Sequence, residues 1–354
     1  MLAAILAALG VLFATMTPLG SPPAHAKKPP PQPLYWGAVI GKQLTGEAPP
    51  WDMGALDAFE RLAGKKVSIL PFSSPFADCS TNPCTHFPFP AGAMETLRER
   101  GVIPMLTWAS QSVPTPLDLK EPHFSLKAIA KGSEDAYIRS FAEQVKQWGH
   151  PFFLRFNHEM NGFWFPWNEG VNGNRRGSFR KAWRHVHDIF TQVGATNATW
   201  VWCPNVDFTR KLTPLHDLYP GGRYVDWTCV DGFNWGNTAN SGGWMSFSRV
   251  FRETYRRILR IAPKKPMMLG EVASEERGGS KSRWIQDALK VIPGRYRHIR
   301  AMIWFEENDR HMRWPIESSK KSRKAFARAI QDPVYRPNEF SGIATDPIPP
   351  PSWP

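Results

Sequence analysis

The stretch EDAYIRSFAEQVKQWGHPFFLRFN, residues 134–157, joins a helical pattern directly to an extended one. A single apolar stripe runs along its first part, at spacings of four, four and three residues, through Tyr137, Phe141, Val145 and Trp148. Residues 152–156 are an apolar run interrupted once, by Arg155, which is typical of a buried strand. An amphipathic helix that leads into a buried strand is the repeating unit of an α/β fold.

The same alternation continues on both sides of this stretch without a break in composition. Eight apolar runs are predicted to be strands: 34–40, 66–72, 102–108, 152–157, 199–205, 226–235, 266–272 and 299–305. A predicted helix follows each of them: 53–63, 91–100, 134–148, 176–193, 215–219, 246–262, 280–291 and 318–331. This pattern predicts a single (β/α)8 TIM barrel domain over residues 34–332. A doubly wound open sheet is the alternative, but it would not require eight units, and the sequence has no phosphate-binding glycine loop.

The segments outside the barrel have a different composition. Residues 1–26 are expected to be an export signal, because LAAILAALGVLFATM is apolar and uncharged and AHA at 24–26 fits a cleavage site. An uncleaved anchor is the alternative, but 15 apolar residues fall short of the roughly 20 that a membrane span needs. We therefore expect a secreted protein, extracellular or periplasmic, without stable membrane insertion. The proline-rich segments at 27–33 and 333–354 are expected to be a linker and a tail, both stiff and unpacked.

Cysteine use agrees with an oxidising compartment. Cys79 and Cys84 bracket the short loop CSTNPC, so a local disulfide is expected there. Cys203 and Cys229 lie in two strands that are predicted to be adjacent, and they are either bridged or buried as thiols.

The chain carries a net charge of +13, and much of the positive charge lies on predicted helices. This pattern favours a solvated outer face; affinity for an acidic polymer or an anionic envelope is the alternative. Nucleic acid is not an expected partner, because an exported chain without a binding motif gives no support for it. The 16 Trp residues are expected to divide between the core and a ligand cleft, since planar aromatics stack on sugars.

Two carboxylates fall where a barrel carries its chemistry, at the C-terminal ends of strands. Glu159 follows the fourth predicted strand in FFLRFNHEMNGFWFPW (152–167), and Glu271 ends the seventh in MMLGEVAS (267–274). Cleavage of a glycosidic bond needs one protonated and one ionised carboxyl group. Glu159 precedes Met, Phe and Trp side chains, whose apolar surroundings raise a carboxyl pKa and suit a general acid and base. Glu271 lies among groups such as Arg155 that favour its ionised form, which suits a nucleophile.

Other chemistries find less support in the sequence. HEMNG is not a zinc motif, because the second His of H-E-x-x-H would stand at position 162, which is Gly. His185 and His187 are two residues apart on a predicted helix and point in different directions. No nucleophile elbow, Walker loop or dinucleotide loop is present. We expect neither a metal nor an organic cofactor. Asp231, in the sixth predicted strand, is expected to be a structural partner of a neighbouring residue.

These motifs resemble glycoside hydrolase family 26, the β-mannanase family, over about residues 34 to 330. In RFNHEMNGFWFPW, the matching positions of the family pattern are Arg155, His158, Glu159, Asn161 and Trp164. WVWCPN, YVDWTCVDGFNWG and PMMLGEVAS resemble the fifth, sixth and seventh strands of the family, in that order. The resemblance implies a retaining mechanism with Glu159 as acid/base and Glu271 as nucleophile. It also implies β-1,4-mannan, mixed-linkage β-glucan or β-1,3-xylan as the substrate.

The resemblance further implies contacts with the sugar. Trp304 would form a stacking floor, and the other expected substrate-binding residues are Arg155, His158, Asn161, Trp164, Trp108 and Trp235. One position departs from the family, which usually has Tyr after Asp-Gly on the sixth strand, where this chain has Phe233. A lost hydrogen bond of about 1.5 to 3 kcal/mol would leave the nucleophile less stabilised, or another donor would replace it.

The sequence therefore predicts a secreted, retaining endo-β-glycan hydrolase that acts as a monomer on a β-linked polysaccharide or oligosaccharide. The alternative is a polysaccharide-binding protein with a degenerate site, acting in envelope or exopolysaccharide biology. Phe233 favours the binding protein, and the intact pair Glu159 and Glu271 favours the enzyme.

Overall fold

The structure, a computed structural model, describes residues 30–209, 211–238, 242–309, 311–338, 343 and 346–353. Residues 31–354 form one compact unit. The export signal expected at residues 1–26 lies outside the described residues. No described helix is both long and apolar enough to cross a bilayer.

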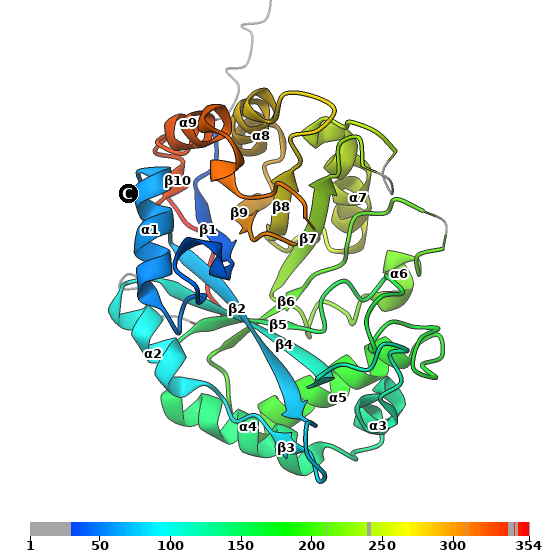
Figure 1. The fold of residues 1–354 in the computed structure, drawn as a ribbon. Helices are drawn as coiled ribbons and strands as arrows, with labels where there is room; N and C mark the ends of the chain where they lie inside the picture. The colour runs from blue at the N-terminus through cyan, green and yellow to red at the C-terminus, as the bar shows by residue number, and fades with distance from the viewer. Residues whose placement is uncertain are drawn as a thin grey trace, which may run out of the picture. The chain divides into compact units, whose positions relative to one another are not determined.

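Eight parallel strands close into a barrel, which confirms the predicted fold (Figure 1). Each strand pairs with the next, β9 pairs with β1, and β1 also pairs with β2 to complete the ring. The barrel strands are β1 (Leu34–Ile40), β2 (Ile69–Asp78), β4 (Ile103–Val113), β5 (Phe152–Phe156), β6 (Ala198–Trp202), β7 (Trp227–Asn234), β8 (Met267–Ser274) and β9 (Ile299–Glu306).

Helices surround the barrel and follow the strands in the predicted order (Figure 1). They are α1 (Met53–Ala63), α2 (Ala91–Glu99), α3 (Leu126–Ala130), α4 (Asp135–Trp148), α5 (Ser178–Val193), α6 (Leu215–Leu218), α7 (Phe247–Ile261), α8 (Lys281–Arg295) and α9 (Lys320–Ala329). The sequence does not predict α3 or the two short strands β3 (Thr85–His86) and β10 (Tyr335–Arg336). The strand β2 runs beyond its predicted end, and its far end pairs antiparallel with β3 and parallel with β4.

Closure of the barrel depends on a glycine in β1. Gly37 pairs with Ile69 of β2, and a Cβ atom at Gly37 would lie 1.9 Å from the Ile69 carbonyl oxygen. Any other residue would therefore push the two strands apart at the seam where the sheet closes.

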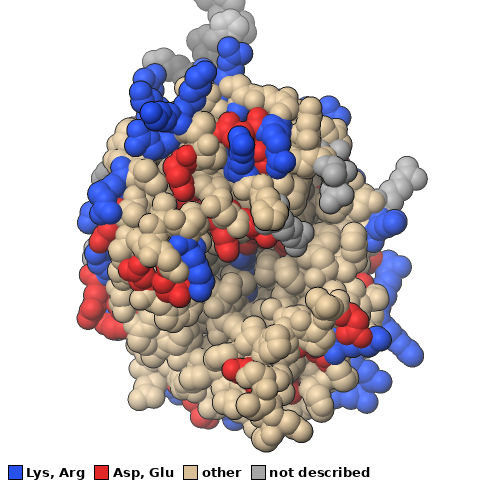
Figure 2. All heavy atoms as spheres, viewed as in Figure 1, with Lys and Arg blue, Asp and Glu red and all other residues tan. Residues whose placement is uncertain are grey.

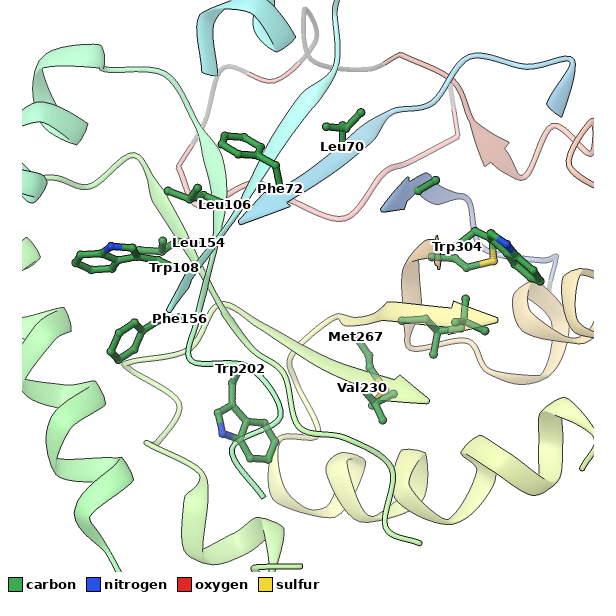
Figure 3. Close-up of a cluster of buried hydrophobic side chains, with 14 of the residues drawn as sticks. Leu70, Phe72, Leu106, Trp108, Leu154, Phe156, Trp202, Val230, Met267 and Trp304 are labelled. Atoms are coloured by element: carbon green, nitrogen blue, oxygen red, sulfur yellow. The ribbon is translucent and has the colours of Figure 1, made fainter. Parts of the chain in front are cut away.

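Strand alternation divides the core into two layers. Side chains that point into the barrel form a lumen cluster that includes Tyr35, Ile69, Ile103, Met105, Phe153, Val201, Trp227, Met268 and Ile303. The alternate residues point outward and pack against the helices; Figure 3 shows Leu106, Trp108, Leu154, Phe156, Trp202 and Trp304 in this outer layer. Successive side chains of a strand face opposite sides, so alternate residues of each strand belong to the lumen cluster and the residues between them belong to the outer layer.

The C-terminal segment closes the lower end of the barrel, where the strands begin. Ile348 is 1% exposed and packs on the lumen cluster. Its N–H donates to Thr199 Oγ1 (2.9 Å) near the start of β6, and its carbonyl accepts from Trp227 Nε1 (2.8 Å) at the start of β7. The expectation that the proline-rich tail is unpacked is therefore wrong for this part of it. Ile348, an apolar residue between prolines, packs into the opening, and one acceptor and one donor at the strand starts satisfy its backbone.

The two ends of the compact unit meet beside this segment. Trp353 Nε1 donates to the Pro31 carbonyl at 3.1 Å, and Tyr35 OH donates to the Pro349 carbonyl at 3.2 Å. The first and last described parts of the unit thus lie together at the lower end of the barrel.

Both pairs of cysteines form disulfides. The Cys79–Cys84 bridge, predicted from the sequence, closes the loop between β2 and β3. The Cys203–Cys229 bridge settles the alternative that the sequence leaves open and joins the end of β6 to β7. Cys84 is exposed, whereas Cys203 and Cys229 are fully buried inside the barrel.

Candidate active site

The two predicted carboxylates meet over the barrel. Glu159 follows β5, and Glu271 lies within β8 near its C-terminal end. One carboxylate oxygen from each of Glu159, Glu271 and Asp231 lies within 4.8 Å of the other two. Figure 2 shows the molecule hollowed at the centre of this face, with acidic side chains beside the hollow and most of the visible Lys and Arg at the periphery. Paired carboxylates about 5 to 5.5 Å apart are the arrangement that retaining glycosidases use.

Glu159 lies in a tight turn that aims its side chain into the site. Its φ is +51°, a left-handed conformation that costs a non-glycine residue about 1 kcal/mol or more. Its N–H donates to the Cys203 carbonyl at 2.7 Å, which anchors the turn to the segment after β6. One carboxylate oxygen accepts from Trp164 Nε1 at 2.7 Å, and the other accepts from Asn205 Nδ2.

Burial sets the protonation of Glu159. Removal of the side chain from water and, to a smaller extent, the negative charge of Glu271 raise its pKa to about 7, against the opposing effect of the hydrogen bonds from Asn205 and Trp164. A carboxyl group with this pKa can give up and take back a proton near neutral pH.

A pair of asparagines holds the Glu159 turn in place. Asn161 accepts from the Asn205 N–H (2.9 Å) and donates to the Asn205 carbonyl (2.9 Å), so the two loops are joined twice. Asn161 is fully buried and therefore positions Asn205 instead of meeting a substrate, which corrects the expected sugar contact. Asn205, which donates to Glu159, was not predicted to be a site residue. It is the last residue of the WVWCPN motif, which was the only signal for it in the sequence.

Glu271 is held by a cation. Arg155 NH2 donates to Glu271 Oε1 at 2.8 Å, Arg155 NH1 donates to Asp231 Oδ2 at 3.2 Å, and Arg155 Nε donates to Thr107 Oγ1 at 2.9 Å. Arg155 is 2% exposed, so its role is to hold Glu271 and Asp231 rather than to contact sugar as expected. Sequence reasoning did predict that Arg155 would support the ionised form of Glu271.

Asp231 bonds the Arg155 guanidinium of β5, and its structural role stays a prediction. It is fully buried, and burial together with the charge of Glu271 raises its pKa well above the usual value. A neutral Asp231 leaves the charge of Arg155 to Glu271. Asp231 and the two glutamates are also a possible set of metal ligands, but the Arg155 guanidinium already bonds two of the three, so a cation would have to displace it.

His158 stands beside the acid/base candidate as a neutral imidazole. Burial, reinforced by the charge of Arg155, lowers its pKa well below the usual value. Its ring lies against Phe165 and Trp167, with centroids 4.8 and 5.6 Å away. Its Nδ1 has no hydrogen-bond partner among the described residues. This Nδ1 atom is itself buried, although the His158 residue as a whole is half-buried.

Comparisons with known proteins agree with this geometry. Residues 127–273 match the description "Glycosyl hydrolase family 26". Residues 127–273, the stretch that carries Glu159 and Glu271, belong by this match to glycoside hydrolase family 26.

The similar proteins carry different names, and the matches cover different shares of the chain. The chain is 35% identical to endoglucanase H of Acetivibrio thermocellus over 301 residues, which are 84% of this chain and 30% of that protein. It is 33% identical to a mannan endo-1,4-β-mannosidase of Bacillus subtilis over 95 residues, 25% of each protein. The chain thus spans less than a third of the length of these relatives. A solved mannanase structure from Bacillus subtilis has a TM-score of 0.60 at 17% identity, covering 90% of this chain and 91% of that one, and it supports the barrel fold.

The family 26 residue Trp164 is joined by two aromatics that sequence reasoning missed. Trp164 stacks on Phe208 with centroids 6.1 Å apart, and Phe163 meets it edge-on at 5.1 Å. Phe163 is 50% exposed and Phe208 is 61% exposed. Together Phe163, Trp164 and Phe208 form an aromatic face beside Glu159. Nothing in the periodic pattern marks Phe208, because it lies in the irregular segment after β6.

Two tryptophans predicted to bind sugar lie in the core instead. Trp108 is fully buried and stacks on Phe141 with centroids 4.2 Å apart. Trp304 is 1% exposed and packs on Phe326 at 5.3 Å. Both occupy outward positions of their strands, so the predictions for them are wrong. The inward neighbour of Trp304 is Phe305, which meets Phe233 edge-on at 5.4 Å.

Trp235 remains a candidate for substrate contact. It is half-buried and packs against Trp314 and Phe233, with centroids 5.1 and 5.8 Å away. Phe233, which replaces the family tyrosine, is therefore part of an aromatic wall formed with Phe305, Trp235 and Trp314.

Proposed function

We propose that this chain is a secreted, retaining endo-β-glycan hydrolase of the β-mannanase type. The observation that carries the proposal is the meeting of carboxylate oxygens of Glu159 and Glu271 within 4.8 Å, with different hydrogen-bond donors around each. Glu159 has neutral donors and a pKa of about 7, whereas Glu271 is paired with the Arg155 guanidinium.

In the first step, a carboxylate oxygen of Glu271 attacks the anomeric carbon and forms a glycosyl ester. The glycosidic bond breaks, its electron pair goes to the departing oxygen, and Glu159 gives that oxygen its proton. In the second step, Glu159 takes a proton from water, the water oxygen bonds to the anomeric carbon, and Glu271 leaves. The configuration at the anomeric carbon is retained, because it is inverted twice.

The surroundings of Glu159 suit a departing sugar. The acid must lie on the leaving-group side of the bond, so the aromatic face of Phe163, Trp164 and Phe208 is placed to receive the part of the chain that leaves. Apolar ring faces stack on the C–H face of a pyranose and leave its hydroxyl groups in water.

The degenerate, binding-only alternative rests on Phe233, which cannot donate a hydrogen bond to Glu271. Arg155 supplies a charge-assisted donor at 2.8 Å, so the nucleophile keeps a strong partner without the tyrosine hydroxyl. Activity is therefore the better-supported reading of the site.

Secretion is part of the proposal. The uncharged apolar stretch at the start of the chain and the two disulfides support it, because disulfides persist in oxidising compartments. Mass spectrometry of protein recovered from the medium or the periplasm tests it, with a mature end expected near residue 27.

The test of function is a substrate panel of β-mannan, lichenan, carboxymethylcellulose and β-1,3-xylan, with reducing ends measured over time. Glucans and mannan are both included because one relative is named an endoglucanase and another a mannan endo-1,4-β-mannosidase. We expect release by the wild type, none by Glu159→Gln or Glu271→Gln, and a β-anomer as the first product by proton NMR. A first-formed α-anomer would exclude retention, and polymer binding without cleavage would favour the binding protein.

A further inference from the structure

The Cys203–Cys229 disulfide lies inside the barrel beneath the proposed catalytic pair. Both cysteines are fully buried and belong to the lumen cluster. Along the seam between β6 and β7, they stand between the paired residues Trp202–Thr228 and Asn205–Asp231. Pro204 has no N–H to donate, and its carbonyl accepts the Asp231 N–H at 3.0 Å. The bridge therefore adds a covalent link to a sparse backbone ladder at the point where the two strands approach the site.

One side of the bridge supports Glu159. The Cys203 carbonyl accepts the Glu159 N–H at 2.7 Å and so holds the left-handed turn that aims the acid. Two residues further on, Asn205 donates to the Glu159 carboxylate. The position of Cys203 therefore fixes both the backbone and the side chain of Glu159.

The other side of the bridge supports Glu271. Cys203 Sγ lies 3.2 Å from Asp231 Oδ1, and the other oxygen of Asp231 accepts from Arg155, which holds Glu271. The sulfurs also press on Gly270, the residue before Glu271. A Cβ atom at Gly270 would lie 2.4 Å from Cys229 Sγ and 2.9 Å from Cys203 Sγ. The backbone of β8 thus rests directly on the bridge.

We propose that the Cys203–Cys229 disulfide is a positioning element that sets the separation and orientation of Glu159 and Glu271, so that hydrolysis depends on the oxidised bridge. This inference rests on the proposed function. Misplacement of a catalytic group by about 1 Å costs on the order of 10²-fold in rate, so a small relaxation of this support has a measurable effect.

The test compares two double variants with the wild type on the best substrate of the panel. Cys203→Ser/Cys229→Ser removes the buried bridge, and Cys79→Ser/Cys84→Ser removes the partly exposed one as the matched control. We expect kcat of the first variant to fall by about 10-fold or more while KM changes by less than about 2-fold, because the aromatic face is untouched. Loosening of the Glu159 turn admits water and lowers the pKa of that carboxyl, so the alkaline limb of the pH profile moves to lower pH. The control variant should keep both kcat and the profile.

Thermal melting shows whether each variant is folded at the assay temperature. If the serine variant does not fold, Cys203→Ala/Cys229→Val fills the space with apolar atoms and carries the same expectation. A folded variant that retains the wild-type kcat and pH profile would overturn the proposal and make the bridge a stabilising link alone. Failure of the wild type on every substrate would instead overturn the proposed function, so the two failures are distinguishable.

An independent test uses the wild type without substitution. Mild reductant on the native protein should release only two thiols, from Cys79 and Cys84, and leave activity intact, because the second bridge is fully buried. Protein refolded under reductant, with four free thiols counted after denaturation, should show the same loss of kcat as the variant. Full activity with four free thiols would contradict the inference.

Discussion

Glu159 and Glu271 present the same functional group in two settings only a few ångströms apart. Neutral donors, an indole N–H and an amide, surround Glu159, and burial raises its pKa to about 7. A guanidinium group holds Glu271, and that guanidinium is itself fixed by Thr107 and Asp231. Burial without a directly bonded cation raises the pKa of Glu159, whereas Glu271 bonds a guanidinium group, and this difference suits the first to proton transfer and the second to nucleophilic attack.

Removal of Glu271 should have the largest effect. Glu271→Ala is expected to lower kcat on polysaccharide by about 10⁴-fold or more, because no other group can form the glycosyl ester. Added azide should restore turnover of an activated aryl β-glycoside and give an α-glycosyl azide, since the anion attacks once from the face that Glu271 leaves open. A β-azide would contradict the assignment, and NMR of the product decides between them.

Removal of Glu159 should lower activity on polysaccharide nearly as much as removal of Glu271 does. Activity on a substrate with a reactive leaving group should fall much less. Glu159→Ala is expected to lower kcat/KM on polysaccharide by about 10²- to 10⁴-fold, the range for general acid–base catalysis. Dinitrophenolate leaves a glycoside without being protonated, so formation of the glycosyl ester should be little changed. Its hydrolysis still needs Glu159, so a burst of dinitrophenol should appear. Azide should here give the β-glycosyl azide, the opposite of the Glu271 variant. Equal losses on both substrates would assign Glu159 another role.

Removal of Asn205 should alter the pKa of Glu159 without removing the group. In the wild type, kcat/KM should fall as pH rises above about 7, because Glu159 must be protonated for the first step. The Asn205 amide stabilises the charged carboxylate, so Asn205→Ala should raise the pKa of Glu159 and move the alkaline limb to higher pH. A loss in kcat of about 10-fold is expected from one hydrogen bond to a charged group. A shift to lower pH would show that Asn205 acts mainly by excluding water.

Changes to the aromatic face should have the smallest effect and should separate binding from chemistry. Phe208→Ala is expected to raise KM by about 3- to 10-fold with little change in kcat, the effect of one lost stacking contact. Trp353→Ala is the matched control, because this exposed aromatic lies at the other end of the barrel. A fall in kcat with unchanged KM would mean that Phe208 supports Trp164, and through it Glu159, rather than the substrate.

The sequence was sufficient for the barrel because each strand and helix carries a strong local pattern. Glu159 and Glu271 were also predictable, since the fold places the ends of strands at one mouth. Trp108 and Trp304 were misassigned because only their nearness to strand ends was considered. Met105 and Ile303 lie on the same two strands and point into the lumen. Trp108 and Trp304 are an odd number of residues away from them, so alternation places both tryptophans on the outer face.

Other features could not be derived from local patterns. Asn205 acts through a hydrogen bond between loops that are distant in sequence, and Phe208 lies in an irregular segment. The closing role of the C-terminal segment was hidden by its prolines, although Ile348 is a lone apolar residue among them and could have raised the question. Contacts of this kind depend on tertiary proximity, which periodicity does not encode.

The meeting of Pro31 and Trp353 at the lower end of the barrel has a practical consequence. A surface, a bead or another module that is tethered through either end of this unit would be held at the pole opposite the cleft. Long polymers could then thread across the open pole without colliding with the anchor. The same closeness of the ends makes the unit suited to circular permutation, in which a short linker joins them and the catalytic mouth is left as it is.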